Sequence, residues 1–273
     1  MKNLLLPILA IAALPLIPTD AAAQFYVVAD DGSVLYRMES GTPAYVTFEN
    51  PNPYNGTVGT AVDLGLPSGT LWADHNIGAT NPEDYGDYYS WGETATKETY
   101  DWSTYFDTND GGQTFGKYNN DDGKTELETS DDVASQTWGG KWQMPTQAMI
   151  AELKSQCYWV WTKTYNGKSV NGYIVYKAKT DTDKGAKVTS GSSPSPAYDV
   201  ATDPHLFLPA AGYRQGSEPR DAGRGYYWSR SLDPNYSYGA CSLGFGSGNV
   251  WDSYARSRGY GFAVRPVVLP AAE

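Results

Sequence analysis

The stretch MPTQAMIAELKSQCYWVWT, residues 144–162, decides the fold class because it joins a helix directly to a strand. Thr146 stands at the expected N-cap, where its hydroxyl can accept a hydrogen bond from a backbone N–H of the first helical turn. Apolar residues then recur at helical spacing: Ala148, Met149, Ile150, Leu153 and Cys157. The run over residues 158–162 is dense in aromatic residues, which favours a strand after the helix.

No comparable helical pattern stands elsewhere in the sequence, and the remainder predicts short strands between turns. Residues 172–176 form a strand candidate, and residues 61–73 look like a hairpin that opens the main domain. Residues 74–135 and 180–204 are rich in polar and turn-forming residues and should be largely loops. The sequence therefore predicts a loop-rich α+β fold of short antiparallel strands with one or two helices.

A small β unit is expected before the main domain. Residues 25–28, 34–36 and 44–48 are its strand candidates, and the proline-rich residues 50–56 form a linker. We predict a small N-terminal β unit with linker over residues 24–52 and the main domain over residues 53–270.

The first 23 residues have the pattern of a secretory signal peptide. A Lys at position 2 precedes an apolar run, and three alanines end at Ala23, after which we expect cleavage. The apolar run is short and interrupted by prolines, so no membrane insertion is expected after cleavage. The sequence thus predicts a secreted, periplasmic or cell-surface protein.

The formal net charge of −11 argues against two classes of partner. An acidic surface repels phosphate backbones and anionic lipid, so neither nucleic acid nor a membrane surface is an expected partner. The two cysteines, Cys157 and Cys241, leave two readings open: a disulfide that closes a long loop, or two buried free thiols.

Catalytic patterns are missing from the sequence. The two histidines, His75 and His205, are far apart, and no Ser/His/Asp arrangement, zinc-binding helix motif or phosphate loop is present. Residues 107–111 and 119–123 look like calcium loops, but Tyr118 stands where the closing acid of the first loop should be, so both are predicted to be polar turns. We expect no catalytic residue, no metal ligand and no cofactor.

Residues 226–262 mix aromatic rings with small polar residues. Framework positions are predicted to be buried: Trp228, Leu243, Phe245, Val250, Phe262 and Val264. Tyr and Trp offer large contact area at low entropy cost, while Ser and Asn add adaptable hydrogen bonds. Because rings also stack on sugar faces, the expected partner is a protein or carbohydrate ligand outside the cell. The predicted ligand-binding residues are Tyr227, Ser229, Asn235, Tyr236, Tyr238, Asn249, Asp252, Tyr254, Arg256 and Tyr260.

An ordered set of segments resembles a known family. The segments are VDLGLPSGTLWA (62–73), YYSWGE (88–93), GKWQMPT (140–146), FLPAAGYR (207–214), YWS (227–229) and VRPV (264–267). Together, over about residues 61–268, they resemble the major paralogous domain proteins exported by gut and rumen bacteria. This resemblance implies a C-type-lectin-like fold, related to formylglycine-generating (sulfatase-modifying) domains.

Two narrower resemblances suggest different functions. GNVW (248–251) matches the sulfatase-modifying pattern, but that enzyme holds copper with a pair of cysteines near the domain end, and this chain has only Cys241 there. Residues 226–265 also look like the hypervariable face of a variable protein from a diversity-generating retroelement, which would make the chain an adhesin or receptor. A third alternative is a structural fimbrial or surface-layer subunit, with the N-terminal β unit as its assembly element.

Overall fold

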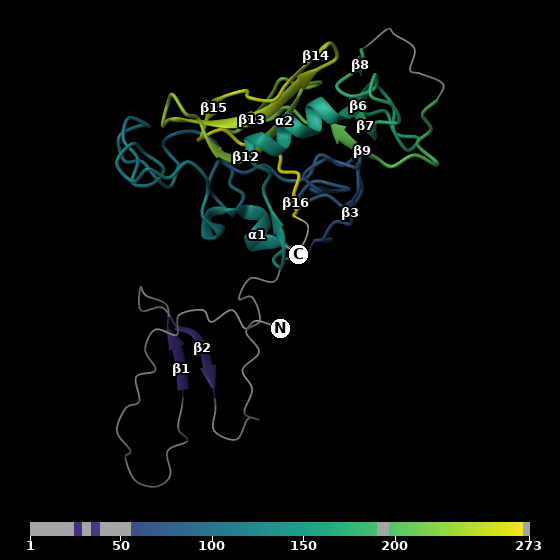
Figure 1. Ribbon diagram of the computed structural model, residues 1–273. Coiled ribbons are helices and arrows are strands. Elements are labelled where there is room, and N and C mark those ends of the chain that lie inside the picture. The colour runs from purple at the N-terminus through teal and green to yellow at the C-terminus, as the bar shows by residue number, and fades with distance from the viewer. Residues whose placement is uncertain (1–24, 29–33, 39–55, 190–196, 270–273) are drawn as a thin grey trace, which may run out of the picture. The chain divides into compact units, whose positions relative to one another are not determined.

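Figure 1 shows the computed structural model, which describes residues 25–28, 34–38, 56–189 and 197–269. The chain divides into two compact units, residues 1–53 and 54–273. This division lies next to the boundary predicted between residues 52 and 53.

The N-terminal unit contains an antiparallel pair of strands. β1 (Phe25–Val28) pairs with β2 (Val34–Met38), which confirms the first two strands predicted there. The third predicted strand, at residues 44–48, and the signal segment lie outside the described residues.

The ends of the main unit meet in one four-stranded sheet. The strands β3 (Ala61–Val62) and β4 (Leu71–Ala73) form the predicted hairpin, and β16 (Val267–Val268) pairs between β4 and β5 (Trp142–Gln143). The last strand of the unit therefore closes against its first hairpin.

The predicted helix–strand junction lies in a second sheet. β6 (Cys157–Thr162) and β7 (Gly172–Lys177) are the two strands that the apolar runs predicted, and they pair antiparallel. The outer strands are β8 (Lys187–Val188), parallel to β6, and β9 (His205–Pro209), antiparallel to β7. β6 and β7 are buried almost along their whole length.

The helix that begins after Thr146 is α2 (Gln147–Gln156), and the Thr146 hydroxyl accepts from the Met149 N–H at 3.2 Å. Ile150 and Leu153 are buried as predicted, whereas Ala148 is exposed, so the apolar stripe is narrower than expected. A second, shorter helix, α1 (Val133–Thr137), is capped by the Asp132 carboxylate and follows a 3₁₀ turn at Thr129–Asp131.

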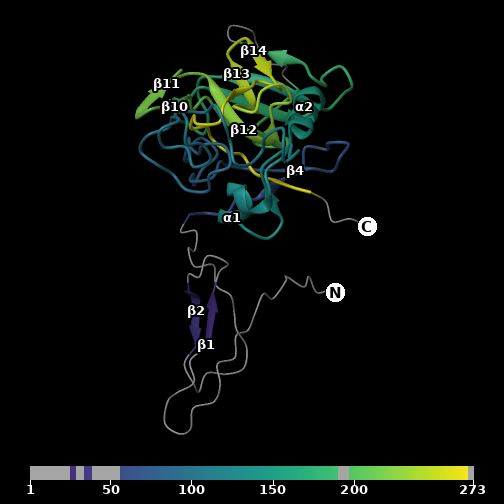
Figure 2. The same ribbon diagram turned by 90° about the vertical axis from the view of Figure 1, so that its left-hand side faces the viewer.

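A third sheet carries the C-terminal segment. β12 (Gly225–Leu232) pairs with β13 (Gly239–Gly246), whose other edge pairs with β14 (Asn249–Trp251) and β15 (Arg256–Ser257). Helix α2 packs against β12 and β13 (Figure 1). A separate hairpin, β10 (Tyr213–Gln215) with β11 (Glu218–Arg220), stands out at one side in Figure 2.

Two aromatic cores lie on opposite faces of β12. Tyr227 belongs to one core with Trp159 and Phe245, while Tyr226 and Trp228 belong to the other. All six framework positions predicted from the sequence are buried: Trp228, Leu243, Phe245, Val250, Phe262 and Val264. The structure thus confirms a loop-rich α+β fold built mostly from small antiparallel sheets.

Candidate ligand-binding site

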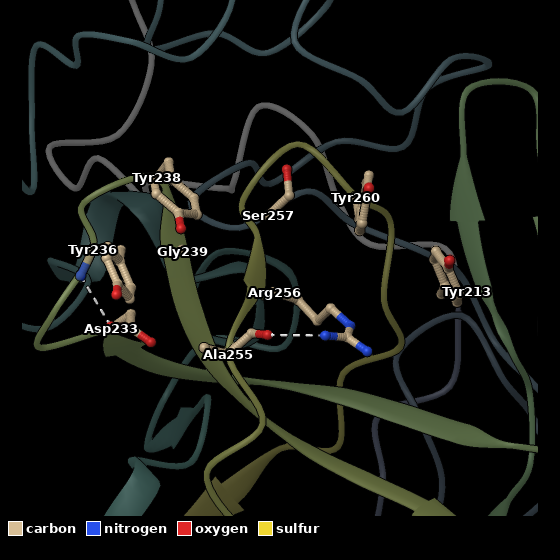
Figure 3. Close-up of a pocket in the computed structure, with 9 residues that line it drawn as sticks. All are labelled: Tyr213, Asp233, Tyr236, Tyr238, Gly239, Ala255, Arg256, Ser257 and Tyr260. Carbon is tan, nitrogen blue, oxygen red and sulfur yellow. Dashed lines mark hydrogen bonds between the residues drawn. The ribbon is translucent and has the colours of Figure 1, made fainter.

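A pocket of about 470 Å³ opens where the β12–β13 turn meets β15 and the β10 hairpin. Figure 3 shows its lining: Tyr213, Asp233, Tyr236, Tyr238, Gly239, Ala255, Arg256, Ser257 and Tyr260. Pockets that hold small ligands usually measure roughly 300–1,000 Å³, so this volume suits one or a few small chemical units.

Two pairs of tyrosines face the pocket from opposite sides. Tyr236 and Tyr238 stack with ring centroids 5.3 Å apart, and their side chains are 57% and 49% exposed. Across the pocket lie Tyr213 and Tyr260 (Figure 3). Their ring centroids are 5.5 Å apart, and the ring planes are inclined at 35°. Burial raises the pKa of Tyr213, so its phenol remains a hydrogen-bond donor at neutral pH.

The turn that presents the first tyrosine pair is fixed by Asp233. Its buried carboxylate accepts from the Asn235 N–H at 2.7 Å and from the Tyr236 N–H at 3.0 Å. The Asp233 N–H donates to the Gly239 carbonyl at 3.1 Å and so closes the turn. Side-chain capping of this kind is what Asp supplies in turns, and here it sets where Tyr236 and Tyr238 stand.

Arg256 lies between the two tyrosine pairs (Figure 3). Its guanidinium lies 3.7 Å from the centre of the Tyr254 ring and donates one hydrogen bond, to the Ala255 carbonyl at 3.3 Å. Among the described residues, no carboxylate oxygen lies within 4.0 Å of the Arg256 guanidinium, which is the distance needed for an ion pair. A partly exposed arginine without an acidic partner is a donor ready for an anion.

Arg258, two residues further on, has a different role. It is fully buried, donates to the carbonyls of Lys117 and Tyr118, and pairs with Asp107 at 3.5 Å. Its backbone N–H donates to the Tyr238 carbonyl at 3.1 Å. Arg258 therefore ties the pocket wall to the loop at residues 107–118.

A second depression of about 220 Å³ adjoins the pocket and shares Asp233 and Tyr236 with it. Its other lining residues are mostly polar and include Asn119, Asn120 and Asn235. The turn at residues 233–237 thus separates two neighbouring depressions of different chemistry, one with four tyrosines and one with three asparagines, Lys124 and two hydroxyl side chains.

The structure brings together five of the ten predicted binding residues. Tyr236, Tyr238, Arg256 and Tyr260 line the pocket, and Asn235 lines the adjoining depression. Sequence reasoning missed Tyr213, Asp233 and Ser257. The Asp-Pro-Asn sequence at residues 233–235 is a turn signal that could have indicated Asp233, but nothing local indicates Tyr213.

Three other predicted residues line neither depression. Asn249 is exposed at the start of β14. The Asp252 carboxylate pairs with Lys154 at 2.8 Å, and the Tyr254 ring packs against the Arg256 guanidinium.

The predictions for Tyr227 and Ser229 are wrong, because both faces of β12 are buried. Tyr227 is 2% exposed and its hydroxyl donates to the Pro209 carbonyl at 2.7 Å. The buried Ser229 hydroxyl donates to the Cys241 carbonyl at 2.7 Å. Both side chains are therefore parts of the framework.

Both cysteines are buried free thiols in the structure, the second of the two readings left open by the sequence. Burial raises the pKa of Cys157 to about 12 and that of Cys241 to about 11. Copper of the sulfatase-modifying kind is held by a pair of thiolates. Cys157 packs in a core with Leu153 and Trp159, whereas the Cys241 thiol donates to the Leu232 carbonyl at 3.5 Å, so the two thiols do not form such a pair. Within the described ranges, no group of three or more His, Cys, Asp and Glu side chains is placed to hold a metal ion.

The two Asp-rich loops are polar turns, as predicted. The Asp107 carboxylate accepts from the N–H groups of Gly116 and Lys117, and Asp122 accepts from those of Tyr118 and Asn119. The carboxylates thus satisfy the backbone of their own loops.

Comparisons of this chain with protein-family models, curated proteins and solved structures give no match. No helix among the residues that the structure describes has the length and apolar character of a membrane span.

Proposed function

We propose that this chain is an exported binding protein whose ligand occupies the pocket between the two tyrosine pairs. The observation that carries the proposal is the exposure of Tyr236 and Tyr238 on a turn that a buried carboxylate holds in place. Large rings exposed side by side on a fixed backbone give contact area without a large ordering cost on binding.

The composition of the pocket supports a protein or carbohydrate ligand outside the cell. Rings, a serine and an arginine are the groups that binding loops use for contact and hydrogen bonding. An adhesin or receptor has this kind of surface, and the signal-like first 23 residues accord with export. The cysteine chemistry described above gives the sulfatase-modifying alternative no support.

We further propose that the fold is C-type-lectin-like and that the pocket residues are diversified by a retroelement. Framework residues such as Trp228 and Phe262 are buried, while Tyr236, Tyr238 and Tyr260 lie on turns around the pocket. Such a surface can change its side chains without disturbing the cores. Sequencing the locus in related strains tests this: diversification predicts changes at pocket positions beside unchanged framework codons, and uniform codons throughout would contradict it.

The binding function is tested on a glycan and protein array with the full chain and two double variants. Tyr236→Ala/Tyr238→Ala removes the stacked pair from the pocket. Tyr85→Ala/Phe106→Ala is the matched control, because these rings are 45% and 50% exposed and line neither depression. We expect array signals that the pocket variant loses and the control keeps. Equal signals from both variants would reject this pocket as the binding site.

A further inference from the structure

The chemistry of the pocket narrows the class of ligand. The Arg256 guanidinium is fixed against Tyr254 and has no acidic partner within the described residues, so it can accept a ligand carboxylate without breaking an ion pair of its own. Arginine binds carboxylate through two parallel N–H groups, which makes the contact directional as well as charged.

The charge of the whole chain limits how acidic the ligand can be. A net charge of −11 repels a polyanion as it approaches, and this repulsion extends over about 8–10 Å at ordinary salt concentrations. A ligand with a single carboxylate is repelled much less, and the unpaired guanidinium attracts it at close range. The balance favours a ligand with one negative charge over a phosphate-bearing or polyacidic chain.

The surroundings of Arg256 favour a sugar over a peptide. Tyr236 and Tyr238 present ring faces, which suit the C–H face of a pyranose, and the adjoining depression offers the amides of Asn120 and Asn235 to hydroxyl groups. Both edges of β13 are already paired, so a peptide could add as a strand only at an outer strand of this sheet, such as β14 or β15.

Resting on the function proposed above, we propose that the site binds an oligosaccharide containing one uronic acid residue. The carboxylate of that residue lies at Arg256, its ring lies on the Tyr236–Tyr238 pair, and the next, neutral sugar extends past the turn into the amide-lined depression. Two joined depressions thus hold two successive sugar units.

Titration calorimetry on the full chain tests this with three probes. The first is a trisaccharide of one glucuronic acid on xylobiose, the second is its neutral methyl ester, and the third is the acidic tripeptide acetyl-Ser-Glu-Ser-amide. We expect the methyl ester to bind about 10- to 100-fold more weakly than the acid, since a charge-assisted contact is lost. Equal binding of the acid and the ester, or tighter binding of the peptide, would overturn the proposal.

Arginine variants test whether the preference for the acid over the ester depends on Arg256. Arg256→Ala should remove the preference for the acid over the ester, and Arg256→Lys should keep part of it, because lysine retains the charge but not the paired N–H geometry. Arg224→Ala removes the same charge from an exposed arginine that does not line the pocket and should leave the preference intact. A preference that survives Arg256→Ala would reject the assignment.

The two proposals fail in different ways. If the uronic trisaccharide does not bind but array ligands still depend on Tyr236 and Tyr238, the acidic-sugar inference is wrong while the binding function stands. If array binding is indifferent to these tyrosines, the proposed function itself is wrong.

Discussion

Replacing Arg258 with methionine should destabilise the main unit strongly. The same replacement at Arg256, two residues earlier in the chain, should not. The Arg258 guanidinium is fully buried, bridges to Asp107 at 3.5 Å and donates to two backbone carbonyls. It also packs 4.1 Å from the centre of the Phe115 ring. Methionine keeps the apolar stem but supplies none of these donors.

The expected cost follows from what is left behind. Removing one partner of a buried, hydrogen-bonded ion pair typically costs about 3–5 kcal/mol, because the remaining charge and carbonyls stay buried without donors. A domain of this size loses about 2–4 °C in melting temperature per kcal/mol, so the melting temperature should fall by about 6–20 °C. The backbone amides of the loop at residues 107–118 should lose their protection against hydrogen exchange first, because Arg258 binds this loop.

Thermal unfolding followed by near-ultraviolet circular dichroism measures this effect, with Arg256→Met as the control. That variant loses the same charge two residues away, but at a partly exposed position, so its stability should stay within about 0.5 kcal/mol of the parent. If Arg258→Met melts within about 2 °C of the parent protein, the structural role assigned to Arg258 is refuted.

Two further predictions concern packing and the thiols. Gly225→Ala should lower the free energy of unfolding by about 1–3 kcal/mol in a urea titration, since a Cβ there would lie 2.0 Å from the Phe245 ring. Gly248→Ala is the control and should cost far less, because open space surrounds Gly248. Equal costs would contradict the packing described for β12 and β13. Cys157 and Cys241 should resist a thiol reagent at pH 8 until the chain is unfolded, when two equivalents react. Because burial raises both pKa values, the thiols' contribution to stability is complete below their ordinary pKa near 8.5. It is lost as the pH rises through about 11 for Cys241 and about 12 for Cys157, and rapid labelling of the folded chain would argue against the burial.

Local signals in the sequence predicted a large part of the fold. Thr146 marked the helix start because capping depends on neighbouring residues alone, and the alternation around Leu243 and Phe245 marked a core strand. Tyr236 and Tyr238 were predicted to bind a ligand, and both are exposed on the turn.

The errors arose where burial depends on distant segments. Tyr227 and Ser229 alternate with aromatic residues as on a half-exposed strand, but β12 has a core on each face, so its period-two pattern does not distinguish inside from outside. Tyr213 reaches the pocket from β10, which no local pattern could reveal. The contrast between Arg256 and Arg258 likewise depends on a loop more than 130 residues earlier in the chain.

The most direct test locates a bound ligand without any substitution. Hydrogen exchange of the full chain, measured by mass spectrometry with and without a saturating array-selected ligand, reports which backbone segments the ligand protects. Binding at the tyrosine pocket predicts slower exchange at residues 233–239 and 255–260. Unchanged exchange in both segments, together with protection elsewhere, would contradict it.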